Sequence, residues 1–185
     1  GITEIVKGRE GATYFRAAPS AGALSPTVIY LATRKVEGLT DSIHSYSARE
    51  HSLAPIWEGN FGNELWEFCY RHKSALNAQM FLILTGVFQR SAWRYGDRAY
   101  RRILLDTGHL LGNAVAYAPE EGLSVVGIGG FFDAAVSDLL FLDPEQEAVL
   151  LIAPIVPQKE LWGVRFSPVF PVPSGRSVPP AAVGE

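Results

Sequence analysis

The segment Ser91–Phe132, SAWRYGDRAYRRILLDTGHLLGNAVAYAPEEGLSVVGIGGFF, decides the fold. Asp97 stands where a short carboxylate can accept hydrogen bonds from a first helical turn, so we expect it to cap a long helix. The apolar run Leu123–Ile128 follows between glycines and predicts a buried strand. Residues 131–140, FFDAAVSDLL, then predict a second, short helix. The long helix is indicated by apolar residues at spacings of three, four and seven, namely Leu104, Leu105, Leu111, Val115 and Ala118.

The rest of the chain alternates between apolar runs and turn-forming residues. Runs rich in β-branched and apolar residues predict strands at 27–33, 79–88 and 147–155. Alternating segments at 43–46 and 51–56 predict a hairpin. This mixture of strands and helices predicts an α+β domain.

Three local features carry weaker expectations. Residues 1–10 favour a turn of helix, which their glycines weaken. Asn60 or Asn63 is expected to cap a helix that ends near Arg71. His109 and Asn113 lie four residues apart on the long helix and are expected to form a buried polar pair.

Composition excludes several classes of protein. With 48% hydrophobic residues the chain can form a real core, and its net charge of −3 with no basic block argues against a nucleic-acid partner. The single cysteine, Cys69, excludes an intrachain disulfide, and we expect a buried thiol. The four histidines have no metal-binding spacing, so no metal is expected. No run reaches the ~18 apolar residues that a membrane helix needs, so we expect no membrane segment and a cytoplasmic location.

Several blocks resemble the flavin-dependent nitroreductase superfamily, and more closely its SagB-type dehydrogenase branch, which includes azoline oxidases. The resemblance covers about residues 12–157. It implies a nitroreductase-like fold with a mainly antiparallel sheet flanked by helices, FMN as cofactor, and a homodimer or a partner chain that completes the flavin site. The blocks are RAAPSAGALSP, VIYLATRKVEGL, IHSYSAREHSL, YGDRAYR, GHLLGN, GIGGF and LLFLDPEQE.

The resemblance also implies a division of the chain. Residues 1–157 would form a nitroreductase-like domain without the family's usual N-terminal segment, and residues 158–185 a proline-rich tail of polyproline II character. In the family the N-terminal segment carries basic residues for the flavin phosphate. We therefore expect this chain to bind FMN weakly on its own, with Lys159 as a loose candidate for the phosphate.

Two glycine-containing turns are candidate flavin contacts. Taken alone, PSAG is an ordinary turn and GIGG a tight turn after a strand; GIGG is not a dinucleotide fingerprint, because Phe132 stands where the last glycine belongs. By resemblance, the proline–serine loop lines the flavin, often from the neighbouring subunit. The second turn places backbone amides against the N5 and O4 edge of the ring. The implied cofactor-binding residues are Pro19, Ser20, Ala21, Gly22, Gly127, Ile128, Gly129 and Gly130.

Arg94 and Tyr95 are the candidate catalytic residues. Azoline oxidases of this branch carry a lysine–tyrosine pair at the matching motif. Arg94 replaces the lysine, and because arginine stays protonated it is a poor general base. Tyr95 is the candidate proton donor or acceptor; its other interpretation is an aromatic at the edge of the core with a satisfied hydroxyl.

Three functions stay open at this point. The first is an FMN-dependent oxidoreductase of the SagB type, with hydride transfer through flavin N5 and a peptide or small molecule as substrate. The second is a catalytically inactive nitroreductase-like module that binds a partner protein or peptide. The third is a general nitro- or quinone-reductase.

Overall fold

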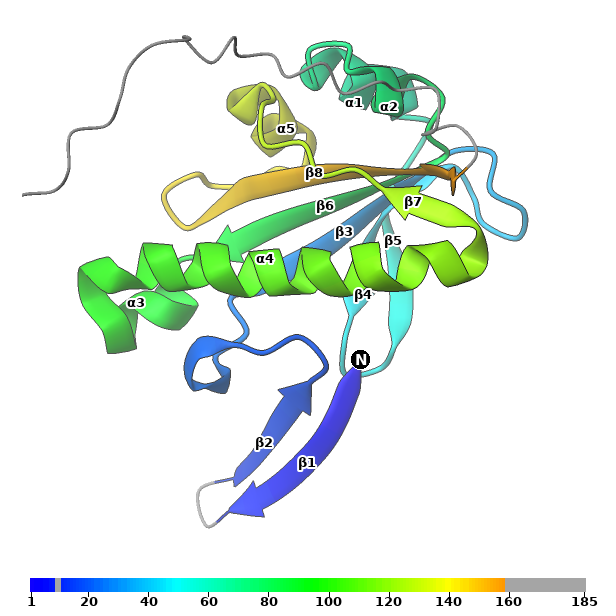
Figure 1. The fold of residues 1–185 in the computed structure, drawn as a ribbon. Coiled ribbons are helices and arrows are strands. Elements are labelled where there is room, and N and C mark those ends of the chain that lie inside the picture. Colours follow the sequence, from blue (N-terminus) through cyan, green and yellow to red (C-terminus); the bar gives the residue numbers. More distant parts are fainter. Residues whose placement is uncertain (9–10, 159–185) are drawn as a thin grey trace, which may run out of the picture.

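The structure, a computed structural model, describes residues 1–8 and 11–158 and is organised around one six-stranded antiparallel sheet (Figure 1). A separate antiparallel hairpin, β1 (Ile2–Gly8) and β2 (Gly11–Arg16), precedes the sheet. The predicted α+β fold with a mainly antiparallel sheet is confirmed. The six strands lie in the order β5 (Ser52–Glu58), β4 (Ser42–Ser47), β3 (Thr27–Thr33), β6 (Met80–Val87), β8 (Glu147–Pro157) and β7 (Leu123–Val125).

Helices lie on both faces of this sheet, so the architecture has three layers (Figure 1). One face carries three short helices, and the other carries one long helix with a shorter helix before it. The short helices are α1 (Gly62–Phe68), α2 (Lys73–Leu76) and α5 (Asp133–Leu139); on the other face lie α3 (Gln89–Tyr95) and α4 (Ala99–Tyr117).

The main hydrophobic core lies between the sheet and the layer of short helices. Phe81 and Ile83 of β6 point into it, because side chains two apart on a strand share a face. Leu65 of α1, Val136 of α5 and Ile152 of β8 complete its centre, and none of these side chains is more than 1% exposed. The core therefore fixes α1 and α5 against the middle of the sheet.

Helix α4 approaches the opposite face of the sheet closely because β6 carries a glycine there. A methyl group added at Gly86 would lie 2.7 Å from the Cγ2 atom of Ile103, which is fully buried. Of the five apolar residues that predicted the helix, three are exposed: Leu104 by 43%, Leu105 by 59% and Val115 by 45%; Leu111 is partly buried and Ala118 is buried. The helix was predicted, but part of its apolar surface is not covered by the residues that the structure describes.

The strands predicted from apolar runs are confirmed as β3, β6 and β8, and the predicted hairpin is formed by β4 and β5. The buried strand expected at Leu123–Ile128 is shorter. Strand β7 ends at Val125, is half-buried and lies at the sheet edge, and Ile128 forms an isolated bridge with Ile152. An edge strand has one neighbour only, which explains why its burial is incomplete.

Both capping predictions need correction. Asp97 lies in the 3-10 turn η2 (Gly96–Arg98), and α4 begins after it with no side-chain cap. Phe61 occupies the N-cap position of α1. Asn60 still contributes, because its Oδ1 atom accepts a hydrogen bond from the Gly62 amide at 3.1 Å.

The helical turn expected at residues 1–10 was also wrong. Ile2–Gly8 is a strand that pairs with β2, from Ile2 opposite Arg16 to Gly8 opposite Gly11. Pairing with a second segment supplies backbone hydrogen bonds that local propensity does not reveal. The tail predicted from residue 158 onward lies, after Gln158, outside the described residues.

The phenol of Tyr30, on β3, is expected to lose its proton late in the alkaline range. Burial, together with the Glu147 carboxylate 3.3 Å away, raises the pKa of Tyr30 to about 12. Because the folded state favours the protonated phenol, this contribution to stability is present below about pH 10, the usual tyrosine pKa, and is lost as the pH rises toward 12. Ultraviolet titration of the phenols should show a step near pH 12 that Tyr30→Phe removes and Glu147→Gln moves to lower pH; the Tyr117 phenol, whose pKa is raised by its hydrogen bond to Glu121, is removed in both backgrounds by Tyr117→Phe. A step near pH 12 that survives in the Tyr30→Phe, Tyr117→Phe double variant would contradict the assignment.

Candidate functional site

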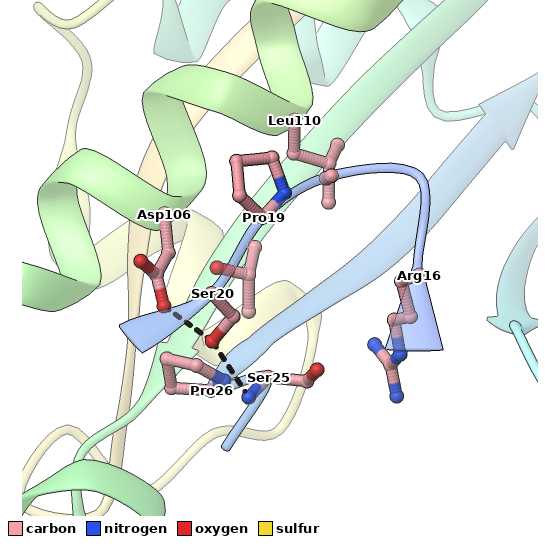
Figure 2. A pocket seen from close by; sticks show the side chains of 9 residues that line it. Arg16, Pro19, Ser20, Ser25, Pro26, Asp106 and Leu110 are labelled. Carbon is pink, nitrogen blue, oxygen red and sulfur yellow. Dashed lines mark hydrogen bonds between the residues drawn. The ribbon is translucent and has the colours of Figure 1, made fainter. Parts of the chain in front are cut away.

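The proline–serine loop between β2 and β3 is anchored to helix α4 by a buried carboxylate (Figure 2). The Ser20 hydroxyl donates to Oδ2 of Asp106 at 2.6 Å, and the Ala21 amide donates to both carboxylate oxygens at 3.2 Å. The amide of Ser25 in turn donates to the Ser20 hydroxyl oxygen at 2.9 Å. Asp106 is only 8% exposed. A loop and a helix far apart in sequence are therefore joined by charge-assisted hydrogen bonds.

These hydrogen bonds determine which groups of the loop remain free to contact a ligand. The only proton of the Ser20 hydroxyl is already donated to Asp106, and its oxygen already accepts one bond. The exposed surface of the loop consists instead of Pro19 and the backbone at Gly22. Small side chains of this kind allow a planar group to approach the backbone.

Arg94 and Tyr95, at the end of α3, lie directly against this loop. A methyl group added at Gly22 would lie 2.7 Å from the Tyr95 hydroxyl oxygen and 3.4 Å from Nη1 of Arg94. Gly22 also has a φ of 64°, which side chains rarely adopt. The structure thus brings together two of the three motifs that the sequence singled out.

The Tyr95 ring lies beneath a guanidinium group, and its hydroxyl is free. The Arg102 Cζ atom lies 4.2 Å from the ring centroid, which is a cation–π contact. The Tyr95 hydroxyl forms no hydrogen bond with any residue that the structure describes, so the expected satisfied hydroxyl is not observed. An unpaired phenol beside a glycine is available to a ligand.

The turn at 127–130 presents free backbone amides. Ile128 is held to β8, since its amide donates to the Ile152 carbonyl at 2.8 Å and its carbonyl accepts from the Ile152 amide at 3.1 Å. The amides of Gly129 and Gly130 form no hydrogen bond within the described part of the chain. Both glycines are exposed, and a methyl group added at either would meet no atom within 4 Å. The turn is therefore rigid at Ile128 and open just after it.

The two turns lie against different sides of α4. Gly22 and its loop are anchored at Asp106, whereas a methyl group at Gly127 would lie 3.1 Å from Cδ2 of Leu111. Five residues of helix separate these two contacts, which corresponds to directions about 140° apart around the axis. The two turns therefore contact α4 in different directions.

Three residues of α4 differ from what the sequence predicted: His109, Asn113 and Asp106. His109 and Asn113 are exposed, so the prediction of a buried polar pair was wrong; the His109 Nδ1–H group donates to the Leu105 carbonyl oxygen, 2.8 Å away. Asp106 was not predicted. Its only signal was an acidic residue within the apolar run ILLDTG, at a position three residues after the buried Ile103.

Other kinds of site find no support among the residues described. No group of three or more histidine, cysteine, aspartate or glutamate side chains gathers there in a way that could hold a metal ion. Cys69 is buried as predicted, and burial raises the pKa of its thiol to about 11. Within residues 1–8 and 11–158, no helix combines the length and apolar character of a membrane span.

Comparisons with known sequences identify relatives of this chain. The sequence profile of the nitroreductase family matches residues 3–155. A nitroreductase-like protein of Methanocaldococcus jannaschii, MJ1384, is 30% identical over 141 residues, which cover 76% of this chain and 70% of that protein. The microcin B17-processing protein McbC of Escherichia coli is 27% identical over 140 residues, 72% of this chain and 51% of McbC.

Solved structures agree with the fold. A crystal structure of a nitroreductase-like protein from Anabaena variabilis superimposes with a TM-score of 0.83 and 42% identity over 89% of this chain. The E. coli microcin synthetase McbBCD complex superimposes with a TM-score of 0.63 and 25% identity over 76% of this chain. The NADPH:FMN oxidoreductase of Vibrio harveyi, complexed with NAD+, superimposes with a TM-score of 0.52 and 25% identity over 76% of this chain.

This chain spans only part of the matched chains, namely 34% of the Anabaena chain, 55% of the microcin synthetase chain and 54% of the Vibrio chain. The profile match nevertheless extends over most of the residues described, from β1 to β8. The fold, the order of the motifs and these matches agree, and the chain belongs to the nitroreductase family.

Proposed function

We propose that this chain is the core of an FMN-dependent oxidoreductase of the SagB-type branch, with a peptide or small molecule as substrate. The family and the flavin chemistry in the name of the Vibrio relative support an oxidoreductase. The likeness to McbC, whose structure is described as a complex with a truncated peptide precursor, supports this branch and a peptide-sized substrate. FMN, when bound, supplies hydride transfer at its N5 atom.

The observation that carries this proposal is the pair of free amides at Gly129 and Gly130. Two backbone donors, fixed in place by the Ile128 bridge and open to solvent, fit the polar edge of an isoalloxazine ring. Donors aimed at the position where negative charge develops stabilise that charge without reorganising. These residues therefore fit the cofactor that the family implies.

Tyr95 and Arg94 are proposed to serve the reacting substrate. The Tyr95 hydroxyl is unpaired within the described residues and can give or take a proton at its Oη atom. Arg94 lies beside it with a permanent positive charge. It can orient an acidic or carbonyl group, but it cannot act as the base.

A second subunit is proposed to complete the site. Leu104, Leu105 and Val115 of α4 are exposed in this chain. Exposed aromatic residues lie at the two ends of the helix, Tyr100 and Tyr117, and Trp93 is exposed on α3. Large exposed apolar patches mark interaction surfaces. A homodimer, or a partner chain that packs there, would bring the Pro19 loop of one chain toward the 127–130 turn of the other.

Tyr95→Phe tests the catalytic part of this proposal. We expect the variant to bind FMN as the wild type does and to lower the steady-state rate of NADPH-driven reduction of an acceptor by about 100-fold, a usual contribution of general acid–base catalysis. Tyr70→Phe is the matched control, because Tyr70 is 62% exposed on the opposite helical layer.

Two outcomes would argue for the other functions. An FMN-loaded protein that neither NADPH nor NADH reduces would favour the inactive, partner-binding module. Full activity of Tyr95→Phe with simple nitro compounds or quinones would favour a general reductase that needs no proton from this tyrosine.

A further inference from the structure

A cavity of about 210 Å³ lies between the N-terminal hairpin and the Pro19 loop. Tyr14 and Arg16 of β2 line one side of it, and Pro19, Ser20 and Ser25 line the other. The cavity is separate from the 127–130 turn and is built largely from the loop that Asp106 anchors. It therefore adjoins the proposed flavin site, with which it shares Pro19 and Ser20, and extends from there toward β2.

Arg16 is a half-buried cation without a counter-charge in the described structure. It forms no hydrogen bond there, and no carboxylate of a described residue lies within ion-pair distance of its guanidinium group. Burial and the neighbouring Arg90 guanidinium lower the pKa of Arg16, while Tyr46 acts in the opposite direction. Removing a charge from water without a partner is unfavourable. The position therefore favours an anion.

Two further arginines flank the same cavity. The Arg90 Nη1 atom donates to the Ser25 carbonyl at 3.4 Å, and Ser25 lines the cavity. The Arg49 Cζ atom lies 5.3 Å from the ring centroid of Tyr14, which also lines the cavity. Arg16 thus lines the cavity itself, while Arg90 and Arg49 are exposed and each contact one residue of its lining.

The nearest acidic group does not neutralise them. Asp106 borders a smaller recess that Arg16 also borders, but its carboxylate accepts from Ser20 and Ala21 and forms no ion pair with Arg16. Figure 2 shows the two side chains on opposite sides of the loop. The positive charge at the cavity is therefore not satisfied by the carboxylate beside it.

We propose that the Arg16 cavity binds an oxyanion, a phosphate or carboxylate group of the molecule that reacts at the flavin. Guanidinium groups bind both kinds of group through paired N–H donors. The cavity is smaller than the roughly 300–1,000 Å³ of sites that hold a whole small molecule, so it receives one group while the rest of the ligand lies toward the Pro19 loop. The identity of the reacting molecule rests on the proposed function; the anion site rests on the cavity and on Arg16, which has no partner among the described residues.

Direct binding tests the site without turnover. Calorimetric titration of the full chain with inorganic pyrophosphate should give saturable binding that weakens with salt. Arg16→Gln should weaken it at least tenfold, and Arg16→Lys should weaken it less, because charge is kept but the fork of donors is lost. Arg71→Gln, which removes an exposed charge in the turn after α1, paired with Glu67, is the matched control and should leave pyrophosphate binding unchanged. Equal affinity of Arg16→Gln and wild type, with equal melting temperatures, would overturn the proposal.

Steady-state kinetics and flavin titrations of Arg16→Gln identify which molecule carries the oxyanion. A KM for NADPH that rises in Arg16→Gln assigns the cavity to a phosphate of the electron donor. If Arg16→Gln raises the KM for 4-nitrobenzoate but not the KM for nitrobenzene, the cavity is assigned to a carboxylate of the acceptor. If Arg16→Gln instead weakens FMN but not riboflavin, the site belongs to the cofactor and the proposal is overturned. Loss of all flavin binding with Arg16-dependent pyrophosphate binding intact would reject the proposed function and keep the anion site.

Discussion

Asp106→Ala is expected to lower the free energy of unfolding by about 2–4 kcal/mol and to weaken FMN binding at least tenfold. The variant leaves the Ser20 hydroxyl and the Ala21 amide without their acceptor in a part-buried place. Each buried group left unpaired costs about 1–3 kcal/mol. The Pro19 loop then loses its attachment to α4, so a ligand must order it on binding. Denaturant unfolding and FMN titration measure the two effects separately.

Two variants sharpen this experiment. Asp106→Asn keeps one oxygen for Ser20 or Ala21 and is expected to show a smaller effect on both quantities. Asp138→Ala is the control, because Asp138 is exposed on α5 and its side chain forms no hydrogen bond among the described residues. An Asp106→Ala protein as stable as wild type would show that the loop is held by other contacts.

Gly130→Val is expected to weaken FMN binding at least tenfold and to leave the fold intact. A Cβ atom added at Gly130 meets no atom of the described residues within 4 Å, and the φ of this glycine lies outside the left-handed region. The free energy of unfolding should therefore change by no more than about 0.5 kcal/mol, as for other surface substitutions. The same isopropyl group would occupy the space in front of the free amides. FMN affinity should fall at least tenfold, measured by titration of flavin absorbance.

Gly8→Val provides the matched control for this change. Gly8 lies near the tip of the β1–β2 hairpin, and among the described residues a methyl group there meets the Gly11 carbonyl oxygen alone, at 3.6 Å, an ordinary contact. Normal FMN affinity in Gly130→Val would remove the 127–130 turn from the cofactor site.

The sequence predicted the parts of the fold that local patterns encode. Residues 27–33 read as a strand because β-branched and apolar side chains fill them, and the long helix read correctly from its apolar spacing. The strand within the first ten residues was not recognised from the sequence, because this glycine-containing strand is stabilised by its pairing with β2 and not by its own composition.

Local sequence patterns predicted less of the candidate site than of the fold. The resemblance pointed to the Pro19 loop and to Arg94 and Tyr95, but not to their contact across Gly22. Asp106 lies 86 residues after Ser20, so no local pattern links them. The anchoring of the loop, and the arginines around the cavity behind it, follow only from the packing of α4, α3 and the hairpin.

The measurement that tests the account most directly is the visible absorption spectrum of the purified chain titrated with FMN. The account predicts a saturable, perturbed flavin spectrum that approaches one FMN per chain at high flavin concentration and that Gly130→Val and Asp106→Ala weaken. A chain that leaves the spectrum of excess FMN unchanged, and still does so when extended by the family's N-terminal segment, would contradict the proposed flavin site and favour a module that only binds a partner.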